Sequence, residues 1–151
     1  MMKVSSVQTF LFILLIGVIG GVAVGIQSPL SSMINQKLGV LESVFIIHLG
    51  GAVFSLIPLL IYGGGKLSEW RSVPWYALIA GALGLVVISA MTYMIPRVGV
   101  ATSLIILLAG QLLIGTVLDY FGWLGAAQKS LDGTRVLGLA VVLLGAWLSV
   151  K

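Results

Sequence analysis

Five long apolar segments dominate the sequence, and they leave a chain of this length few possible folds. A helix that crosses a bilayer needs about 20 consecutive, mostly apolar residues. Lipid offers the backbone no hydrogen-bond partner, so apolar segments of this length cross a membrane as helices. The sequence predicts five spanning helices, at residues 7–34, 42–62, 74–96, 98–121 and 134–150.

The composition agrees with a membrane location. Hydrophobic residues make up 60% of the 151 residues and charged residues only 8%, and the mean hydropathy is +1.21. Soluble domains carry about 25% charged residues, so this chain has too little charge to cover a water-soluble globule. The formal net charge of +4 is spread over the loops and ends, which is typical of headgroup and orientation charge rather than a nucleic-acid-binding surface. We expect an integral membrane protein that binds the lipid bilayer and no nucleic acid.

Short breaks separate the segments. Gly39 follows the first segment and suits a left-handed backbone conformation, and Pro74 is tolerated in the first turn of the third helix. The residues between the third and fourth segments leave room only for a tight reversal. Because all connections are short, we expect an all-α, polytopic bundle in which residues 1–151 form one transmembrane domain. The breaks lie at residues 38–39, 63–66, 72–74, 96–99 and 129–134.

The distribution of basic residues gives only a weak orientation signal. Lysine and arginine favour the cytoplasmic side of a membrane. One side of the five-helix layout carries Lys3, Lys66, Arg71, Lys129 and Arg135, and the other carries Lys37, Arg97 and Lys151. This bias favours a cytoplasmic N-terminus, but it is small enough to permit insertion in both orientations.

Three residues of the fourth segment form a stripe on one helix face. Gln111, Gly115 and Asp119 recur at every fourth position. A polar side chain inside a membrane is costly and marks a functional site by default. Gln111, near the helix centre, makes either an interhelical hydrogen bond or a ligand contact. Asp119, near the helix end, either forms an ion pair or couples transport to a proton or cation. The candidate ion-pair partners, on the same side of the membrane, are Arg135, Lys129 and Arg71.

The first segment combines small and polar residues. Gly17, Gly21 and Gly25 have the spacing that lets two membrane helices approach closely, so they predict a helix-packing seam. Gln27 lines a cavity in one interpretation and meets the headgroups in the other. Pro29 lacks a backbone donor and is expected to kink or loosen the helix, as in transporters whose broken helices line binding sites.

Two further residues each allow two interpretations. His48 could take part in proton coupling because histidine titrates near neutral pH, or it could be a packed or interfacial residue. Tyr93 could stack on a ligand or anchor the chain at the interface.

Catalytic and metal-binding patterns are missing from the sequence. There is no cysteine, and the single histidine, His48, cannot form a metal site alone. No nucleophile–base set and no phosphate-binding glycine loop occurs. We therefore predict no enzyme activity, no catalytic residue, no metal and no cofactor.

Several of these motifs together resemble the YdcZ-like family of the drug/metabolite transporter superfamily. The resemblance covers nearly the whole chain and rests mainly on Pro96–Ala101, Ala109–Leu113 and Leu118–Gly122, with support from Gln27, Pro29, Leu38-Gly39, Pro74-Trp75, Arg135, Gly138 and Gly145. It implies a half-size, five-helix protein of the bacterial cytoplasmic (inner) membrane that corresponds to half of a ten-helix inverted-repeat transporter. Family proteins are described as exporters.

The resemblance also implies how copies assemble. Two five-helix chains in opposite orientation would reproduce the ten-helix architecture, as an antiparallel homodimer or as a heterodimer with a sister chain. Family members often carry asparagine where this chain has Ser31, so this chain lacks the side-chain amide of that asparagine. The first helix has no acid, so the proton-antiport mechanism of the related four-helix multidrug exporters does not carry over.

We therefore predict a transporter subunit that exports a small polar or amphipathic solute as a dimer, by alternating access. The residues predicted to line the substrate path are Gln27, Ser31, Tyr93, Gln111 and Gly115, and those predicted for coupling are His48 and Asp119. The alternative is a non-transporting membrane subunit that stabilises or regulates a partner, for which the glycine seam would serve equally well.

Overall fold

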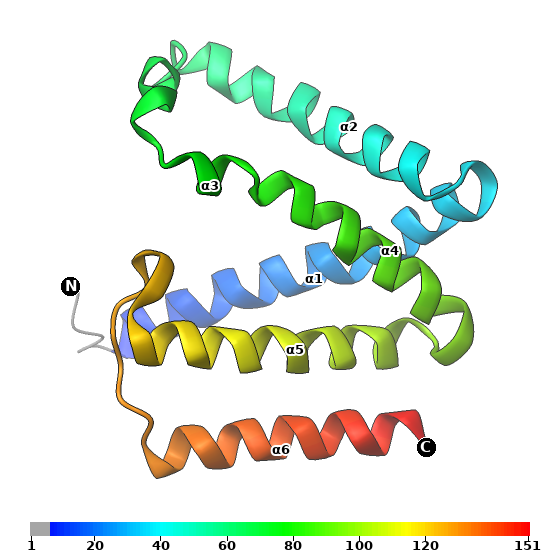
Figure 1. The fold of residues 1–151 in the computed structure, drawn as a ribbon, viewed down its shortest axis with the longest axis vertical. Coiled ribbons are helices and arrows are strands. Elements are labelled where there is room, and N and C mark those ends of the chain that lie inside the picture. Colours follow the sequence, from blue (N-terminus) through cyan, green and yellow to red (C-terminus); the bar gives the residue numbers. More distant parts are fainter. Residues whose placement is uncertain (1–6) are drawn as a thin grey trace. The chain divides into compact units, whose positions relative to one another are not determined.

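The described chain is almost entirely helical. The computed structural model describes residues 7–151, so Lys3 lies outside the described residues. Five helical stretches are long and apolar enough to cross a membrane, which confirms the predicted fold class. The elements in chain order are α1 (Val7–Leu38), α2 (Val40–Ile61), η1 (Leu67–Ser72), α3 (Trp75–Leu78), α4 (Ala80–Val98), α5 (Val100–Phe121), η2 (Trp123–Gly125) and α6 (Gly133–Val150) (Figure 1).

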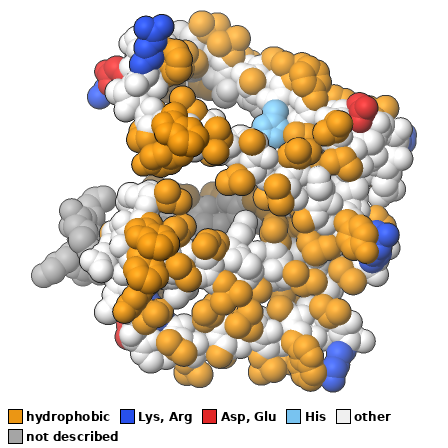
Figure 2. Space-filling view, viewed as in Figure 1, with side chains coloured by type: hydrophobic (Ala, Val, Ile, Leu, Met, Phe, Trp, Pro, Cys, Tyr) orange, Lys and Arg blue, Asp and Glu red, His pale blue; other side chains and the backbone are white. Residues whose placement is uncertain are grey.

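The chain divides into two compact units, residues 1–93 and 94–151. In the first unit α1 contacts α2 near the corner that joins them, and in the second unit α5 and α6 lie side by side (Figure 1). α4 begins in the first unit and ends in the second. Large apolar side chains are exposed along every span, and Figure 2 shows them over much of the face in view. Such a surface suits lipid, because apolar side chains exposed to water would cost free energy.

The first span is longer than predicted and is not broken by its proline. α1 continues through Pro29 to Leu38, four residues beyond the predicted end. Proline at position 29 removes one backbone hydrogen bond. On either side of it, the hydroxyls of Ser28 and Ser31 donate to the Val24 and Gln27 carbonyl oxygens, each at 2.8 Å. The predicted loosening at Pro29 therefore does not interrupt the helix.

The third span was predicted as one helix, but it is interrupted near its start. Ile79 has φ −81° and ψ 0°, and it separates α3 from α4. The amide of Ala82 consequently donates to the Ile79 carbonyl oxygen three residues back, at 2.9 Å, in place of a bond four residues back. The stretch Trp75–Val98 is still long enough to span a membrane.

A single glycine forms each of the two tightest corners, between α1 and α2 and between α4 and α5. Gly39 has φ 104° and ψ 168°, and Gly99 has φ 83° and ψ 167°. This backbone region is essentially restricted to glycine. The glycine amides donate to the Asn35 and Ile95 carbonyl oxygens at 2.8 and 3.0 Å. The tight reversal predicted at residues 96–99 is therefore confirmed.

The two corners share a sequence pattern as well as a geometry. Each has a basic residue two positions before the glycine, a valine after it and a serine four positions after it, so the corners repeat at an offset of 60 residues. Ser43 and Ser103 are both completely buried, and their amides donate to the Gly39 and Gly99 carbonyl oxygens at 3.1 and 3.2 Å. The α1–α2 and α4–α5 corners therefore share one backbone structure.

Candidate functional site

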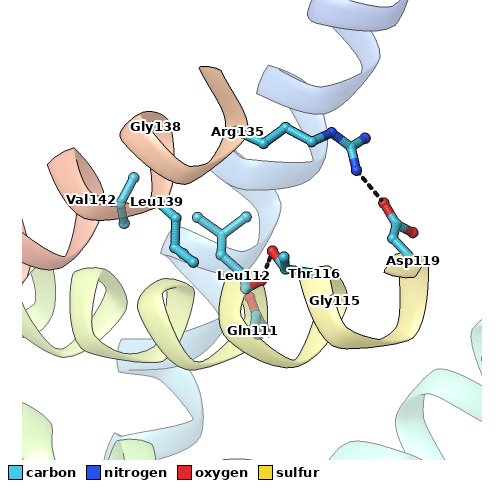
Figure 3. Close-up of a pocket in the computed structure, with 9 residues that line it drawn as sticks. All are labelled: Gln111, Leu112, Gly115, Thr116, Asp119, Arg135, Gly138, Leu139 and Val142. Atoms are coloured by element: carbon cyan, nitrogen blue, oxygen red, sulfur yellow. Dashed lines mark hydrogen bonds and ion pairs between the residues drawn. The ribbon is translucent and has the colours of Figure 1, made fainter. Parts of the chain in front are cut away.

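A polar groove lies between α5 and α6, in the second unit. Its volume is about 510 Å³, and it is open on one side. Figure 3 shows Arg135 reaching from α6 toward Asp119 at one end of the groove, with Leu112, Leu139 and Val142 between the two helices. The lining residues are Gln111, Leu112, Gly115, Thr116, Asp119, Arg135, Gly138, Leu139 and Val142.

The groove takes its position from the connection between α5 and α6. Gly122 ends α5 in a left-handed conformation, with φ 67° and ψ 26°. The chain then folds back, and the Lys129 amide donates to the Asp119 carbonyl oxygen at 2.8 Å. Asp132 caps α6, because its carboxylate accepts from the Arg135 amide at 2.8 Å. These bonds bring the start of α6 beside the end of α5.

Asp119 and Arg135 form an ion pair at this end of the groove. Nη1 of Arg135 lies 3.4 Å from Oδ2 of Asp119, and the side chains are 35% and 36% exposed. Of the three partners predicted for Asp119, the structure shows this one. A strong charge-assisted bond is about 2.7–2.9 Å long, so the contact is loose. Within residues 7–151, no other hydrogen bond engages either charged group.

The other predicted residues of the stripe, Gln111 and Gly115, are among the residues that line the same groove. Gln111 is exposed, and its carboxamide makes no hydrogen bond within residues 7–151. The interhelical hydrogen bond that was one interpretation of Gln111 is therefore not formed in that part of the chain. A Cβ atom added at Gly115, or at Gly138 on α6, would meet no atom within 4 Å. These two glycines therefore leave the groove wide.

A second tie joins α5 and α6 away from the ion pair. The Thr102 hydroxyl donates to the Ser149 carbonyl oxygen at 3.0 Å, near the beginning of α5 and the end of α6. The sequence offered no signal for this bond, because a threonine in a membrane helix can equally bond to its own preceding turn. Contacts therefore join α5 and α6 near both ends of the pair. The groove lies nearer the end with the ion pair.

The predicted path residues Gln27, Ser31 and Tyr93 belong to the first unit. Gln27 is exposed, Ser31 is buried and Tyr93 is 63% exposed. The Ser31 carbonyl oxygen accepts a hydrogen bond of 3.2 Å from the Ser43 hydroxyl on α2. Ser31 therefore takes part in the contact between α1 and α2. That these three residues line one substrate path stays a prediction.

Polar residues near the end of α1 form a buried stripe, and of these only Ser31 was predicted to line the substrate path. Ser28, Ser31, Ser32 and Asn35 are all buried and follow the spacing of one helix face. Nδ2 of Asn35 and Oγ1 of Thr92 are buried without a hydrogen-bond partner among the described residues. The spacing was visible in the sequence, but polar residues near a helix end are also typical of contact with headgroups.

His48 packs closely against a glycine of α4. Its Nδ1 lies 2.8 Å from the Val44 carbonyl oxygen, so Nδ1 carries the proton of that bond. A Cβ atom added at Gly84 would lie only 2.6 Å from Nε2 of His48. The packed interpretation of His48 thus has a structural basis, while its role in coupling stays a prediction.

The predicted glycine seam on α1 is open. A Cβ atom added at Gly17, Gly21 or Gly25 would meet no atom within 4 Å. Packing of another helix along these glycines stays a prediction. Residues 7–151 also contain no group of three histidine, cysteine or acidic side chains that could hold a metal ion.

Comparison with known proteins gives one consistent result. The model of a family described as "Putative inner membrane exporter, YdcZ" matches residues 12–148. The chain is 28% identical over 136 residues to the inner membrane protein YdcZ of Escherichia coli (strain K12), covering 87% of this chain and 89% of that protein. No solved structure matches the chain. With five apolar spans and a family match over most of its length, the chain is an integral inner-membrane protein that belongs to the YdcZ family of exporters.

Proposed function

We propose that the chain is a transporter subunit that exports a small polar or amphipathic solute. The observation that carries this proposal is the α5–α6 groove, which Gln111 lines inside an apolar span with an amide that has no hydrogen-bond partner in residues 7–151. An amide in a membrane needs a partner, because an unsatisfied polar group in hydrocarbon costs free energy. A solute with a polar group and an apolar part would meet both Gln111 and the apolar wall of the groove.

The charge of the groove supports a solute without strong net charge. Its two ionised lining groups, Asp119 and Arg135, neutralise each other. Gly115 and Gly138 leave space between the helices. We propose Gln27, Ser31, Tyr93, Gln111 and Gly115 as the substrate path and His48 and Asp119 as candidates for coupling.

Two chains would assemble the complete transporter by this proposal. Transporters that work by alternating access often contain inverted repeats with the substrate site between them, near the midplane. A chain with five spans has its ends on opposite sides of the membrane, so two copies in opposite orientation supply inverted repeats. The partner is a second copy in antiparallel orientation or a sister five-helix chain.

Flux measurements test the proposed path. Purified protein in liposomes should carry members of a panel of small polar and amphipathic solutes. Gln111→Leu should lower the flux about tenfold, which is the effect of losing a hydrogen bond of about 1.4 kcal/mol. Gln8→Leu is the matched control, because Gln8 lies exposed near the start of α1. Equal flux in Gln111→Leu and the parent would remove Gln111 from the path.

A topology measurement tests the antiparallel arrangement. Reporter tags on the C-terminus should be read from both sides of the membrane if the chain inserts in both orientations. A single orientation would require a parallel dimer or a sister chain.

The alternative function is a non-transporting subunit that stabilises or regulates a partner protein. The open glycine face at Gly17, Gly21 and Gly25 favours it, because this face can receive a helix from another chain. Solute flux by protein purified without any partner would reject this alternative.

A further inference from the structure

We propose that the Asp119–Arg135 end of the groove binds the headgroup of a zwitterionic phospholipid with a primary ammonium group. The phosphate takes the unused donors of Arg135, and the ammonium donates to the free oxygen of Asp119. One acyl chain then runs along the α6 wall of the groove. The lipid would share the groove of the proposed solute path, but its binding does not require that a solute is transported.

The ion pair lies at the level expected for lipid headgroups. Asp119 is two residues before the end of α5, and Arg135 is in the first turn of α6. An aromatic cluster marks the same end: the rings of Tyr120 and Phe121 are 5.0 Å apart, and those of Phe121 and Trp123 are stacked at 4.7 Å. Such side chains concentrate where a membrane meets water. A headgroup can therefore reach the pair without leaving its ordinary depth.

Both members of the pair have unused hydrogen-bonding capacity. A guanidinium carries five N–H donors, and a carboxylate has two accepting oxygens. The single contact at 3.4 Å uses one nitrogen and one oxygen, and no other hydrogen bond engages these groups within residues 7–151. Arginine binds phosphate in a bidentate manner. The loose pair can thus open to accept two opposite charges of one ligand.

The local charge favours a zwitterion over an anion. Lys129 and Arg135 are balanced by Asp119 and Asp132 at this end of the α5–α6 pair. The helix dipoles add the same polarity, since the N-terminus of α6 is positive beside Arg135 and the C-terminus of α5 is negative beside Asp119. A phosphate–ammonium pair matches this arrangement, whereas a headgroup with net negative charge finds no excess of cations.

The groove also provides a wall for an acyl chain. Gly138, Leu139 and Val142 line its α6 side, and no atom lies within 4 Å of a Cβ added at Gly138. Gln111 is eight residues from Asp119, or about 12 Å along the helix axis at 1.5 Å per residue. A headgroup on the ion pair therefore leaves the Gln111 amide free.

Lipid retention tests the headgroup site. The protein is reconstituted in equal parts of phosphatidylethanolamine, phosphatidylcholine and phosphatidylglycerol without solute, extracted gently, and examined for bound lipid by native mass spectrometry. The parent should retain phosphatidylethanolamine about fivefold over each of the other lipids, as expected for about one favourable charge interaction at a membrane surface. Asp119→Asn and Arg135→Gln should each bring this ratio close to one.

Asp132→Asn is the control for charge. It makes the same change of charge as Asp119→Asn at the same end of the molecule, and asparagine caps a helix as well as aspartate does. It should keep the parent's preference for phosphatidylethanolamine over phosphatidylcholine, while the excess cation it leaves raises retention of phosphatidylglycerol. Circular dichroism of each variant checks that the helices remain folded.

A second pair of variants leaves all charges in place. Gly138→Leu fills the groove and should reduce retention of every lipid, whereas Gly145→Leu adds the same side chain to α6 outside the groove and should not. Equal retention of the three lipids by the parent would overturn the proposal, as would a preference for phosphatidylglycerol. An unchanged preference in both Asp119→Asn and Arg135→Gln would overturn it as well.

Discussion

At the scale of single residues, glycines decide where side chains from other helices can lie. Gly84 leaves the space that the His48 ring occupies, and Gly115 and Gly138 leave the α5–α6 groove open. The same residue type therefore serves close packing in one place and an open groove in another. The difference is whether a side chain of the neighbouring helix fills the space beside the glycine.

We expect Gly84→Ala to destabilise the protein by about 1–3 kcal/mol, the usual cost of overpacking. The added Cβ would lie 2.6 Å from His48 Nε2, so the ring must move. Thermal unfolding in detergent measures the effect. Gly81→Ala is the control, because that position is open and alanine favours a helix. If His48→Ala in the same chain does not reduce the cost of Gly84→Ala, the packing explanation is wrong.

We expect the Asp119–Arg135 pair to contribute little to stability despite its place in the groove. The contact is 3.4 Å long and each side chain is about one-third exposed, so the coupling energy should be below about 1 kcal/mol. A double-mutant cycle with Asp119→Asn and Arg135→Gln, followed by thermal unfolding, measures it. A coupling of several kcal/mol would show that the pair is mainly structural.

At the scale of elements, the two glycine corners are the clearest repeated feature. The α1–α2 and α4–α5 corners have matching dihedral angles, matching buried serines and matching backbone bonds. They differ in one respect. Ser43 donates across to α1 at Ser31, whereas Ser103 donates to the Gly99 carbonyl oxygen of its own corner at 2.7 Å.

We expect Gly39→Ala and Gly99→Ala to cost about 1–3 kcal/mol each, because a residue with a Cβ is strained at these dihedral angles. Gly110→Ala, in the middle of α5 with open space around it, should not destabilise the chain. Chemical unfolding of the three variants makes the comparison. A stable Gly99→Ala variant would contradict the argument from backbone strain.

The corners should also be exchangeable. Replacing residues 37–40 by the sequence of residues 97–100 changes Lys37 to arginine and Leu38 to valine and keeps the glycine and valine. The free energy of unfolding should change by less than about 1 kcal/mol, because size and charge are nearly conserved. A large loss of stability would show that the two corners are alike in shape only.

At the scale of the whole molecule, orientation in the membrane depends on few charges. One side of the five-helix layout carries the basic residues Lys3, Lys66, Arg71, Lys129 and Arg135, and the other carries Lys37, Arg97 and Lys151. Lysine and arginine counts near the spans set orientation. This difference can be reversed by neutralising three residues on the more basic side.

We expect variants biased in opposite directions to complement each other. Arg97→Gln with Lys151→Gln should fix one orientation, and Lys66→Gln with Arg71→Gln and Lys129→Gln should fix the other. If the working unit is an antiparallel homodimer, each variant alone should lose export activity, and co-expression of the two should restore it. Full activity of either variant alone would contradict that arrangement.

Much of the fold could be predicted because each span depends on its own residues. Apolar segments longer than about 17 residues become membrane helices whatever their neighbours, and Gly39 and Gly99 end helices through local backbone chemistry. The interruption at Ile79 was missed, since residues 75–80 contain no glycine or proline. The site was predicted in part: periodicity placed Gln111, Gly115 and Asp119 on one face, and charge restricted the partner of Asp119 to three residues.

The sequence by itself determined the five spans, their corners and the polar face of the fourth span, because hydropathy, backbone strain and helical period are local properties. Only the tertiary structure decided that Arg135 meets Asp119, that Gly138 faces the groove and that the His48 ring rests on Gly84. Each of these facts joins residues on different helices. The packing of one helix against another depends on the shapes of both surfaces together, and the period of a single helix does not contain that information.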